Sequence, residues 1–135
     1  MSSFDVDAAA SYARSEARTS STGRCATHVR LAIEAGGVEL ERQVSAKNYG
    51  TSLSRAGFTR LAQPPQSSPQ KGDVIVIQPY PGGSDHGHIA IYDGSAWISD
   101  FVQRDKWGGA GYRQHEPAYE IYRHSSQETP GATHE

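Results

Sequence analysis

The hydrophobic pattern of this chain changes halfway along, at a proline-rich segment spanning residues 63–70. Before this segment, apolar residues recur at spacings of three and four, which is the period of an amphipathic helix. After it, short runs rich in β-branched and aromatic residues are divided by turns, as is typical of strands. The prolines remove backbone donors and restrict their neighbours, so the segment is expected to be a connector, too short to separate domains. Helices followed by an antiparallel sheet predict an α+β fold.

The expected elements follow from these two patterns. One domain is predicted over residues 1–124, followed by a flexible C-terminal tail at 125–135. The Asp93-Gly94 pair is a strong signal for a two-residue hairpin turn. Helices are expected over 5–18, from about 23 to the Gly36-Gly37 pair, and over 45–56. Strands are expected over 72–78, 88–94, 95–101 and 118–124.

Composition excludes several classes of protein. The formal charge of -2 and pI near 6.3 provide no basic field for binding nucleic acid. No apolar run approaches the roughly 20 residues that cross a bilayer, and the N-terminus lacks the apolar core of a signal peptide. The protein is therefore expected to be made in the cytoplasm without a signal peptide, and to reach any outside target by another route. A single cysteine cannot form an internal disulfide.

That single cysteine, Cys25, is the first candidate for chemistry. Ser20, Ser21 and Thr22 supply capping side chains, which places Cys25 in the first turn of the following helix. There the helix dipole and unpaired backbone N–H groups favour a thiolate, the nucleophilic form of cysteine. A lone cysteine is more often a small buried apolar residue, so a catalytic interpretation needs further residues.

A histidine and an acid later in the chain supply that context. His88 opens an expected strand, and Asp100 lies one hairpin further on. With a two-residue turn at Asp93-Gly94, His88 and Asp100 fall near matching positions on adjacent strands. A carboxylate beside an imidazole holds its tautomer and stabilises the imidazolium. These residues predict a Cys25–His88–Asp100 triad.

Two other histidines leave alternatives open. His86 and His88 are two residues apart, and with Asp85 or Asp100 they could form a metal site. Gly87 suggests instead that the strand starts only at His88, which leaves His86 in the preceding loop. His28 lies three residues after the cysteine on the same helix, where a surface position is the simpler assignment.

The ordered motifs GRCATHV, KGDVIVI, HGHIAIYDG and WISDF resemble a known family. They are similar to the cysteine, histidine-dependent amidohydrolase/peptidase (CHAP) family and to the NlpC-type cell-wall peptidases, over about residues 20–103. The resemblance implies a single papain-like domain, with the N-terminal helices packed on a small antiparallel sheet. It implies Cys25 as nucleophile, His88 as general base and acid, and Asp100 as the residue that orients His88. Asp73 matches a strand-opening aspartate with a structural part.

The resemblance also implies a function. Members of these families mostly hydrolyse an amide bond of peptidoglycan, in the stem peptide or at the sugar–peptide junction, and need no cofactor or metal. Small members without a signal peptide resemble phage lysins and amidase effectors, so peptidoglycan, a delivery machine and a cognate immunity protein are the expected partners. The expected place of action is the cell wall or periplasm, after delivery by a secretion system or lysis.

Two other functional hypotheses stay open at this point. One is a non-catalytic papain-like module that binds cell-wall peptide or a partner protein, and the other is a His/Asp metal-dependent hydrolase. Substrate-binding residues are not identified by the sequence. Trp97, Trp107 and Tyr112 are candidates to line a cleft, although aromatic residues in a small sheet are more often core. The glycine-rich segment 107–112 is expected to be a loop over the substrate or a plain turn.

Overall fold

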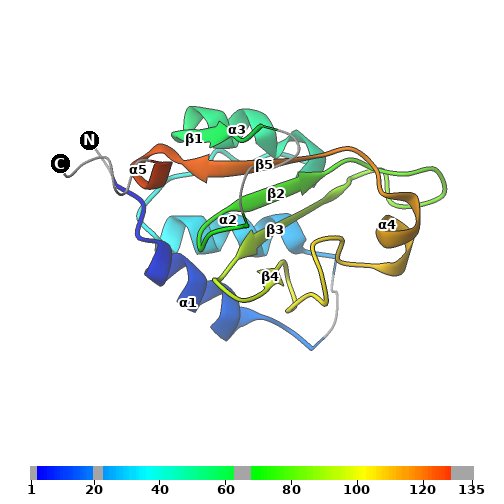
Figure 1. Cartoon of the computed structure of the whole chain (residues 1–135), viewed down its shortest axis with the longest axis horizontal. Coiled ribbons are helices and arrows are strands. Elements are labelled where there is room, and N and C mark those ends of the chain that lie inside the picture. Colours follow the sequence, from blue (N-terminus) through cyan, green and yellow to red (C-terminus); the bar gives the residue numbers. More distant parts are fainter. Residues whose placement is uncertain (1–2, 20–22, 63–67, 129–135) are drawn as a thin grey trace.

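A five-stranded antiparallel sheet forms the centre of the molecule (Figure 1). The structure, a computed structural model, describes residues 3–19, 23–62 and 68–128. Strand β5, the last in the sequence, lies between β1 and β2, so the sheet order is β1-β5-β2-β3-β4. The strands are β1 (Phe58–Arg60), β2 (Val74–Ile77), β3 (His88–Tyr92), β4 (Trp97–Ile98) and β5 (Tyr119–His124).

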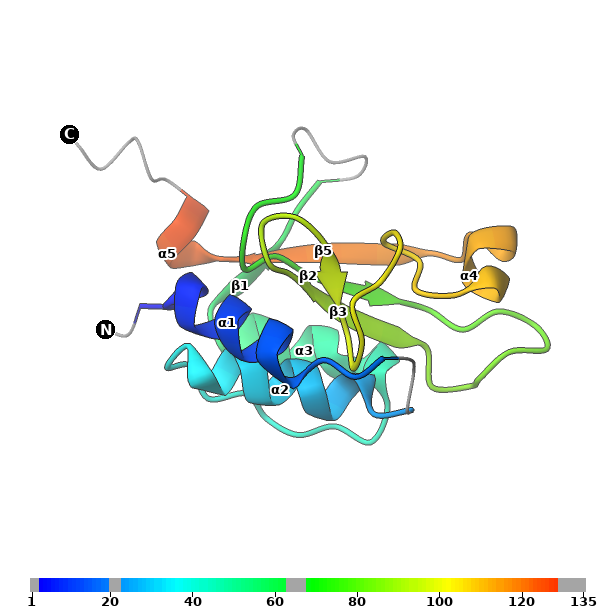
Figure 2. The ribbon, with the colours of Figure 1, turned by 90° about the horizontal axis from the view of Figure 1, so that it is seen from below.

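Three α-helices from the first half of the chain lie on the same side of this sheet (Figure 2). They are α1 (Val6–Glu16), α2 (Cys25–Ala35) and α3 (Tyr49–Arg55), the last preceded by a 3₁₀ turn, η1 (Ala46–Asn48). All three predicted helices are therefore present, and the predicted α+β class with an antiparallel sheet is confirmed. Two shorter helices follow later in the chain, α4 (Ala110–His115) and α5 (Ser125–Glu128). No helix in the described ranges is long and apolar enough to span a membrane.

The sheet has a hydrophobic core on each face because strand side chains alternate in direction. On the face covered by the helices, the β2 and β3 residues are Val74, Val76, Ile89 and Ile91. On the opposite face, Ile75, Ile77 and Ala90 pack with Trp97 and Trp107. The two tryptophans are thus core residues.

The β3–β4 hairpin is present, but its turn was predicted one residue too early. Tyr92 pairs with Trp97, whereas an Asp93-Gly94 turn would pair Tyr92 with Ser95. The Asp93 carboxylate accepts hydrogen bonds from the backbone N–H groups of Ser95 (2.9 Å) and Ala96 (2.7 Å). This side-chain cap stabilises a turn centred one residue later, which shifts the pairing by two residues. Strand β4 ends at Ile98, before Asp100, where the chain reverses and Ile98 pairs with Val102.

Strand β1 was missed by the sequence reasoning, because three residues are too few to display an alternating pattern. The beginning of the predicted tail is also ordered, since residues 125–128 form α5 and the Ser126 hydroxyl accepts a hydrogen bond from the Phe4 N–H (3.3 Å). The rest of that tail, residues 129–135, lies outside the described residues, as do Ser20, Ser21 and Thr22 and positions 63–67 of the connector.

Asp73, the residue before β2, is fully buried and joins two strands. Its carboxylate accepts hydrogen bonds from Nε and Nη2 of Arg123 on β5, both at 2.8 Å. The Gln70 N–H donates to the same carboxylate at 2.9 Å. A two-pronged contact of this kind fixes both direction and distance. The contacts agree with a structural part for Asp73.

Candidate active site

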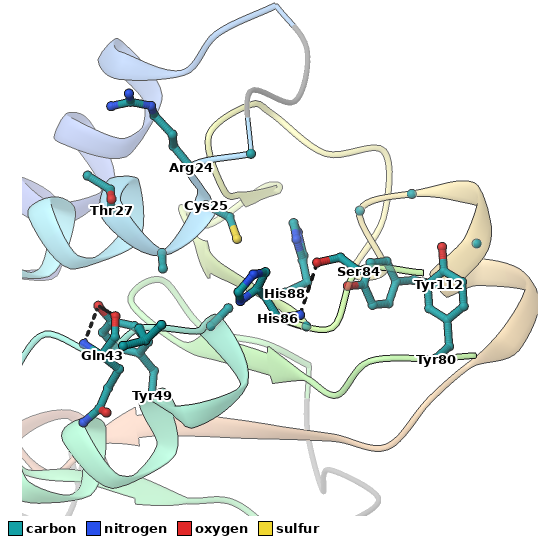
Figure 3. Close-up of a pocket in the computed structure, with 18 of the residues that line it drawn as sticks. Arg24, Cys25, Thr27, Gln43, Tyr49, Tyr80, Ser84, His86, His88 and Tyr112 are labelled. Carbon is teal, nitrogen blue, oxygen red and sulfur yellow. Dashed lines mark hydrogen bonds between the residues drawn. The ribbon is translucent and has the colours of Figure 1, made fainter. Parts of the chain in front are cut away.

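Cys25 and His88 line one cavity of about 1000 Å³ (Figure 3). Cys25 is the first residue of α2 and His88 is the first residue of β3. Their two elements pack directly against each other, so the start of the helix meets the start of the strand. The two residues lie 63 positions apart in the sequence, and the tertiary fold brings them to one site.

The Cys25 side chain is half-buried, and this environment favours the neutral thiol. Burial raises the pKa of Cys25 above its ordinary value, and the negative charge of Asp100 acts in the same direction. Hydrogen bonds to the sulfur from the backbone N–H groups of Ile89, Ala26 and Cys25 itself lower the pKa and oppose this rise. Because the net shift is upward, the cysteine needs a base to become a nucleophile at neutral pH.

His88 lines the same cavity as Cys25 and is the candidate base. The hydrogen bonds of its ring determine its tautomer. Its Nε2 lies 2.6 Å from Oε1 of Gln103. The Gln103 amide nitrogen donates to the backbone oxygen of Asp105 (2.9 Å), so the Gln103 oxygen must face the imidazole. His88 therefore carries its proton on Nε2 and presents Nδ1 as the basic nitrogen. Burial lowers the pKa of His88, against the opposing effects of Gln103 and Asp100, so the ring is neutral at rest.

Asp100 is fully buried and lies two residues after the end of β4. Its Oδ2 accepts a hydrogen bond from the Arg24 N–H (3.1 Å), and its backbone oxygen accepts one from the Arg18 N–H (2.8 Å). These bonds hold the chain just before α2. Its charge raises the pKa of both Cys25 and His88. The hydrogen bond to Nε2 of His88, expected of Asp100, is made by Gln103.

Gln103 was missed because no sequence pattern singles it out. It follows Asp100 by three residues, in a loop beyond the end of β4. After β4 the chain turns back, so that Ile98 pairs with Val102 and the Gln103 N–H donates to the Trp97 backbone oxygen (2.8 Å). This turn, and not the predicted continuation of the strand, accompanies the contact of Gln103 with His88. A polar residue two positions past the fourth motif, WISDF, was the available signal, but it had no expected partner.

His86 lines the same cavity, whereas His28 is not among the described residues that do. The Nδ1 of His86 lies 2.6 Å from the Ser45 hydroxyl oxygen, which tethers the loop before β3 to the start of η1. No three His, Cys, Asp or Glu side chains within 3–19, 23–62 and 68–128 form a group able to hold a metal ion. A metal site built from His86, His88 and Asp85 or Asp100 thus lacks its third ligand among these residues.

The segment predicted as a loop or turn contributes one wall of the cavity. Gly108, Gly109, Ala110, Gly111 and Tyr112 all line it, with the last three belonging to α4. Tyr112 is thus the one of the three aromatic candidates that reaches the cavity. Gly108 has a positive φ of +80°, and a Cβ at this position would lie 2.6 Å from Nε2 of His88. Only glycine lets the backbone approach the imidazole so closely.

An α+β domain with a thiol at a helix N-terminus and a neutral imidazole in the same cavity has the layout of a cysteine-dependent hydrolase. Such a pair can carry out acyl transfer when the imidazole removes the thiol proton. The walls of the cavity carry Arg24, Arg42, Thr27, Ser84 and Tyr80, and no Asp or Glu is among its described lining residues.

Two crystal structures are similar to this chain over most of its length. One is the native type VI effector–immunity complex Tae3–Tai3 from Ralstonia pickettii, at 53% identity and a TM-score of 0.83, covering 90% of this chain and 99% of the other. The other is the selenomethionine form of that complex, at 55% identity and a TM-score of 0.79, covering 85% and 98%. No protein-family model and no curated protein matches the chain. The chain belongs to the Tae3 family of type VI effectors.

Proposed function

We propose that this protein is a peptidoglycan hydrolase that cleaves an amide bond in the stem peptide, or at the sugar–peptide junction, with Cys25 as its nucleophile. The observation that carries the proposal is the pairing, in one cavity, of the Cys25 thiol with a neutral imidazole held by Gln103. Membership of the Tae3 family supports an effector role. The motif resemblance to the CHAP and NlpC-type enzymes supports a papain-like fold and a cell-wall substrate.

The mechanism follows from the protonation states of the two groups. Nδ1 of His88 takes the proton of the Cys25 thiol as the sulfur attacks the amide carbonyl carbon. Backbone N–H groups at the start of α2 donate to the oxyanion that forms. The His88 imidazolium then protonates the leaving amine, and the acyl group remains on the sulfur. A water molecule gives a proton to His88 as its oxygen attacks the thioester carbon. The C–S bond then breaks, the acid is released, and the imidazolium returns the proton to the Cys25 sulfur.

Gln103 and Asp100 have separate roles in this scheme. Gln103 is the positioning residue, because its Oε1 accepts a hydrogen bond from the Nε2–H of His88 and this keeps Nδ1 unprotonated and available to the thiol. Asp100 acts through its charge, which favours the imidazolium that forms during the reaction. It also holds the N–H of Arg24, the residue next to the nucleophile. The orienting role that the sequence analysis expected of Asp100 is here proposed for Gln103.

A cognate immunity protein is the proposed partner. The similar Tae3 structures are complexes of an effector with its immunity protein. A cell that makes a wall hydrolase needs such an inhibitor wherever the enzyme meets its own wall. We propose that delivery by a type VI secretion system brings the protein to the wall of a target cell.

Hydrolysis of purified Gram-negative peptidoglycan under reducing conditions tests the proposal, with mass spectrometry of the released fragments. The wild-type protein should release fragments whose masses identify the bond, and Cys25→Ala should release none. His28→Ala is the matched control, because this residue is on the same helix but outside the cavity lining. Digestion by Cys25→Ala at the parent rate would refute the nucleophile. Binding to peptidoglycan without cleavage by reduced, folded wild-type protein would favour a non-catalytic module.

A further inference from the structure

Four aromatic rings form a continuous series from His88 to the surface. The centroid of His88 lies 5.6 Å from that of Tyr112 with the planes tilted by 39°. Tyr112 meets Tyr80 edge to face at 4.8 Å, and Tyr80 stacks on His115 at 4.6 Å and 17°. Figure 3 shows Tyr80 and Tyr112 on the side of His88 that faces away from Cys25. The exposed His115 ends the series at the last residue of α4.

The series joins two separate segments of the cavity wall. Tyr80 comes from the loop between β2 and β3, which also carries Ser84 and His86 of the lining. Tyr112 and His115 come from α4. The Tyr80 ring therefore connects a loop with few regular hydrogen bonds to the helix whose Tyr112 contacts the imidazole.

Glycines make the space that Tyr80 occupies. A Cβ on Gly83 would lie 2.5 Å from Cζ of Tyr80, and a Cβ on Gly111 would overlap the Tyr80 hydroxyl. Backbone from both segments thus lies directly against the ring. A side chain enclosed in this way has little freedom to move, because close-packed neighbours transmit displacement instead of absorbing it.

His88 needs a restraint of this kind. The hydrogen bond from Nε2 to Gln103 restrains one atom of the imidazole, whereas the torsion about its last side-chain bond is intrinsically broad. Contact with Tyr112 restrains the ring plane, and Tyr112 is itself held by Tyr80. The direction of Nδ1 relative to the thiol therefore depends on two contacts of the imidazole, the hydrogen bond to Gln103 and the packing against Tyr112.

We propose that Tyr80 is a positioning residue for His88, acting through Tyr112 without itself touching the reacting atoms. The inference rests on the proposed function, because it takes His88 as the base for Cys25. Its ring, and not its hydroxyl, carries the effect. Loss of the ring should release Tyr112, widen the range of His88 orientations and lower the fraction of molecules in which Nδ1 faces the thiol.

Substitution of the ring tests the proposal. Tyr80→Phe keeps the ring and should keep kcat close to the parent value. Tyr80→Leu should lower kcat by about 10- to 100-fold with little change in KM, as expected for a misdirected catalytic group. Tyr92→Leu is the matched control, since Tyr92 is also half-buried and packs on an aromatic ring, Trp97 at 5.1 Å, but does not line the cavity.

A second pair of variants displaces the ring without deleting it. Gly83→Ala should reproduce the loss of kcat, because its methyl group would drive into Tyr80. Gly82→Ala, on the same loop, meets nothing within 4 Å and should leave kcat nearly unchanged despite its positive φ. This pair keeps the test valid even if Tyr80→Leu fails to fold, which thermal unfolding would reveal.

Alkylation of Cys25 by iodoacetamide across pH gives a readout that needs no peptidoglycan. The alkylation rate follows the thiolate form of Cys25, which His88 promotes when Nδ1 accepts the thiol proton. Loss of that contact should shift the Cys25 alkylation profile to higher pH in Tyr80→Leu and Gly83→Ala, while Tyr80→Phe and Gly82→Ala leave the profile unchanged. Folded Tyr80→Leu and Gly83→Ala proteins with the parental profile would overturn the proposal. If the parent protein is alkylated with the expected pH dependence but releases no peptidoglycan fragments, the proposed function is refuted instead.

Discussion

Removal of the Gln103 side chain should lower catalytic efficiency, because the buried Nε2–H of His88 then loses its acceptor. His88 is only 8% exposed, so water cannot readily replace the lost partner. A buried donor left without a partner costs about 1–3 kcal/mol. If this cost falls on the productive orientation of His88, kcat/KM should drop about 5- to 150-fold, at about 1.4 kcal/mol for each factor of ten.

The comparison of Gln103→Ala with Gln103→Glu separates the acceptor from the rest of the side chain. Glutamate retains an oxygen for His88 but loses the bond to the Asp105 backbone oxygen. It should retain more activity than alanine, and its negative charge should raise the pKa of His88 and shift the acidic limb of the pH profile upward. The assay is kcat/KM for peptidoglycan fragments over a range of pH, with circular dichroism to verify folding.

Asp100→Asn provides the matched control for the same assay. Asparagine keeps an oxygen for the Arg24 N–H but removes the negative charge that acts on His88. If Gln103 orients His88, Gln103→Ala should be the more damaging of the two substitutions. Parental kcat/KM in folded Gln103→Ala, together with a large loss in Asp100→Asn, would refute this reasoning and restore Asp100 as the orienting residue.

Further predictions concern pH, a glycine and a buried ion pair. Because burial lowers the pKa of His88 and raises that of Cys25, kcat/KM should be flat over a wider pH range than the two free groups would give. It should fall on the acidic side as His88 is protonated, below the usual range of a histidine, and on the alkaline side as the thiol ionises, above the usual range of a cysteine. Gly108→Ala should lower kcat by displacing His88, and its positive φ should cost about 1–2 kcal/mol of unfolding free energy in urea denaturation. Arg123→Met should cost about 3–5 kcal/mol in the same measurement, because Asp73 is left buried and uncompensated.

Each of these predictions has an outcome that contradicts it. A kcat/KM profile with its acidic limb above pH 6.5 would show that His88 is not a buried neutral base. Full activity in Gly108→Ala would mean that the backbone can move away from the imidazole at no cost to catalysis. Arg55→Met is the control for the ion pair, since the Arg55–Glu41 pair is exposed and should contribute little. Equal losses of unfolding free energy in Arg123→Met and Arg55→Met would show that burial does not make the Arg123–Asp73 pair more important than an exposed pair.

Local patterns were enough to place the two proposed reacting groups, Cys25 and His88, on their elements. The change of hydrophobic period separated the helices from the strands. The apolar spacing predicted a helix from about residue 23 with Cys25 in its first turn, and α2 begins at Cys25 itself. The Gly87-His88 pair placed the start of β3 at His88. These features depend on neighbouring residues only, since helix and strand signals are carried by the period of side chains along the chain. Their meeting in one cavity remained a hypothesis until the fold was known.

The partners of those groups depended on the tertiary structure. Asp93 accepts hydrogen bonds from the turn, and the hairpin pairing differs by two residues from the predicted one. Beyond β4 the chain turns back through the Ile98–Val102 pair, and Gln103 makes the hydrogen bond to Nε2 of His88. The contact of Tyr80 with Tyr112 likewise joins elements separated along the chain. The sequence by itself determined which residues begin the helix and the strand, because those signals are local. Only the tertiary structure decided which side chains restrain His88, because strand register and close backbone packing set distances that no local pattern contains.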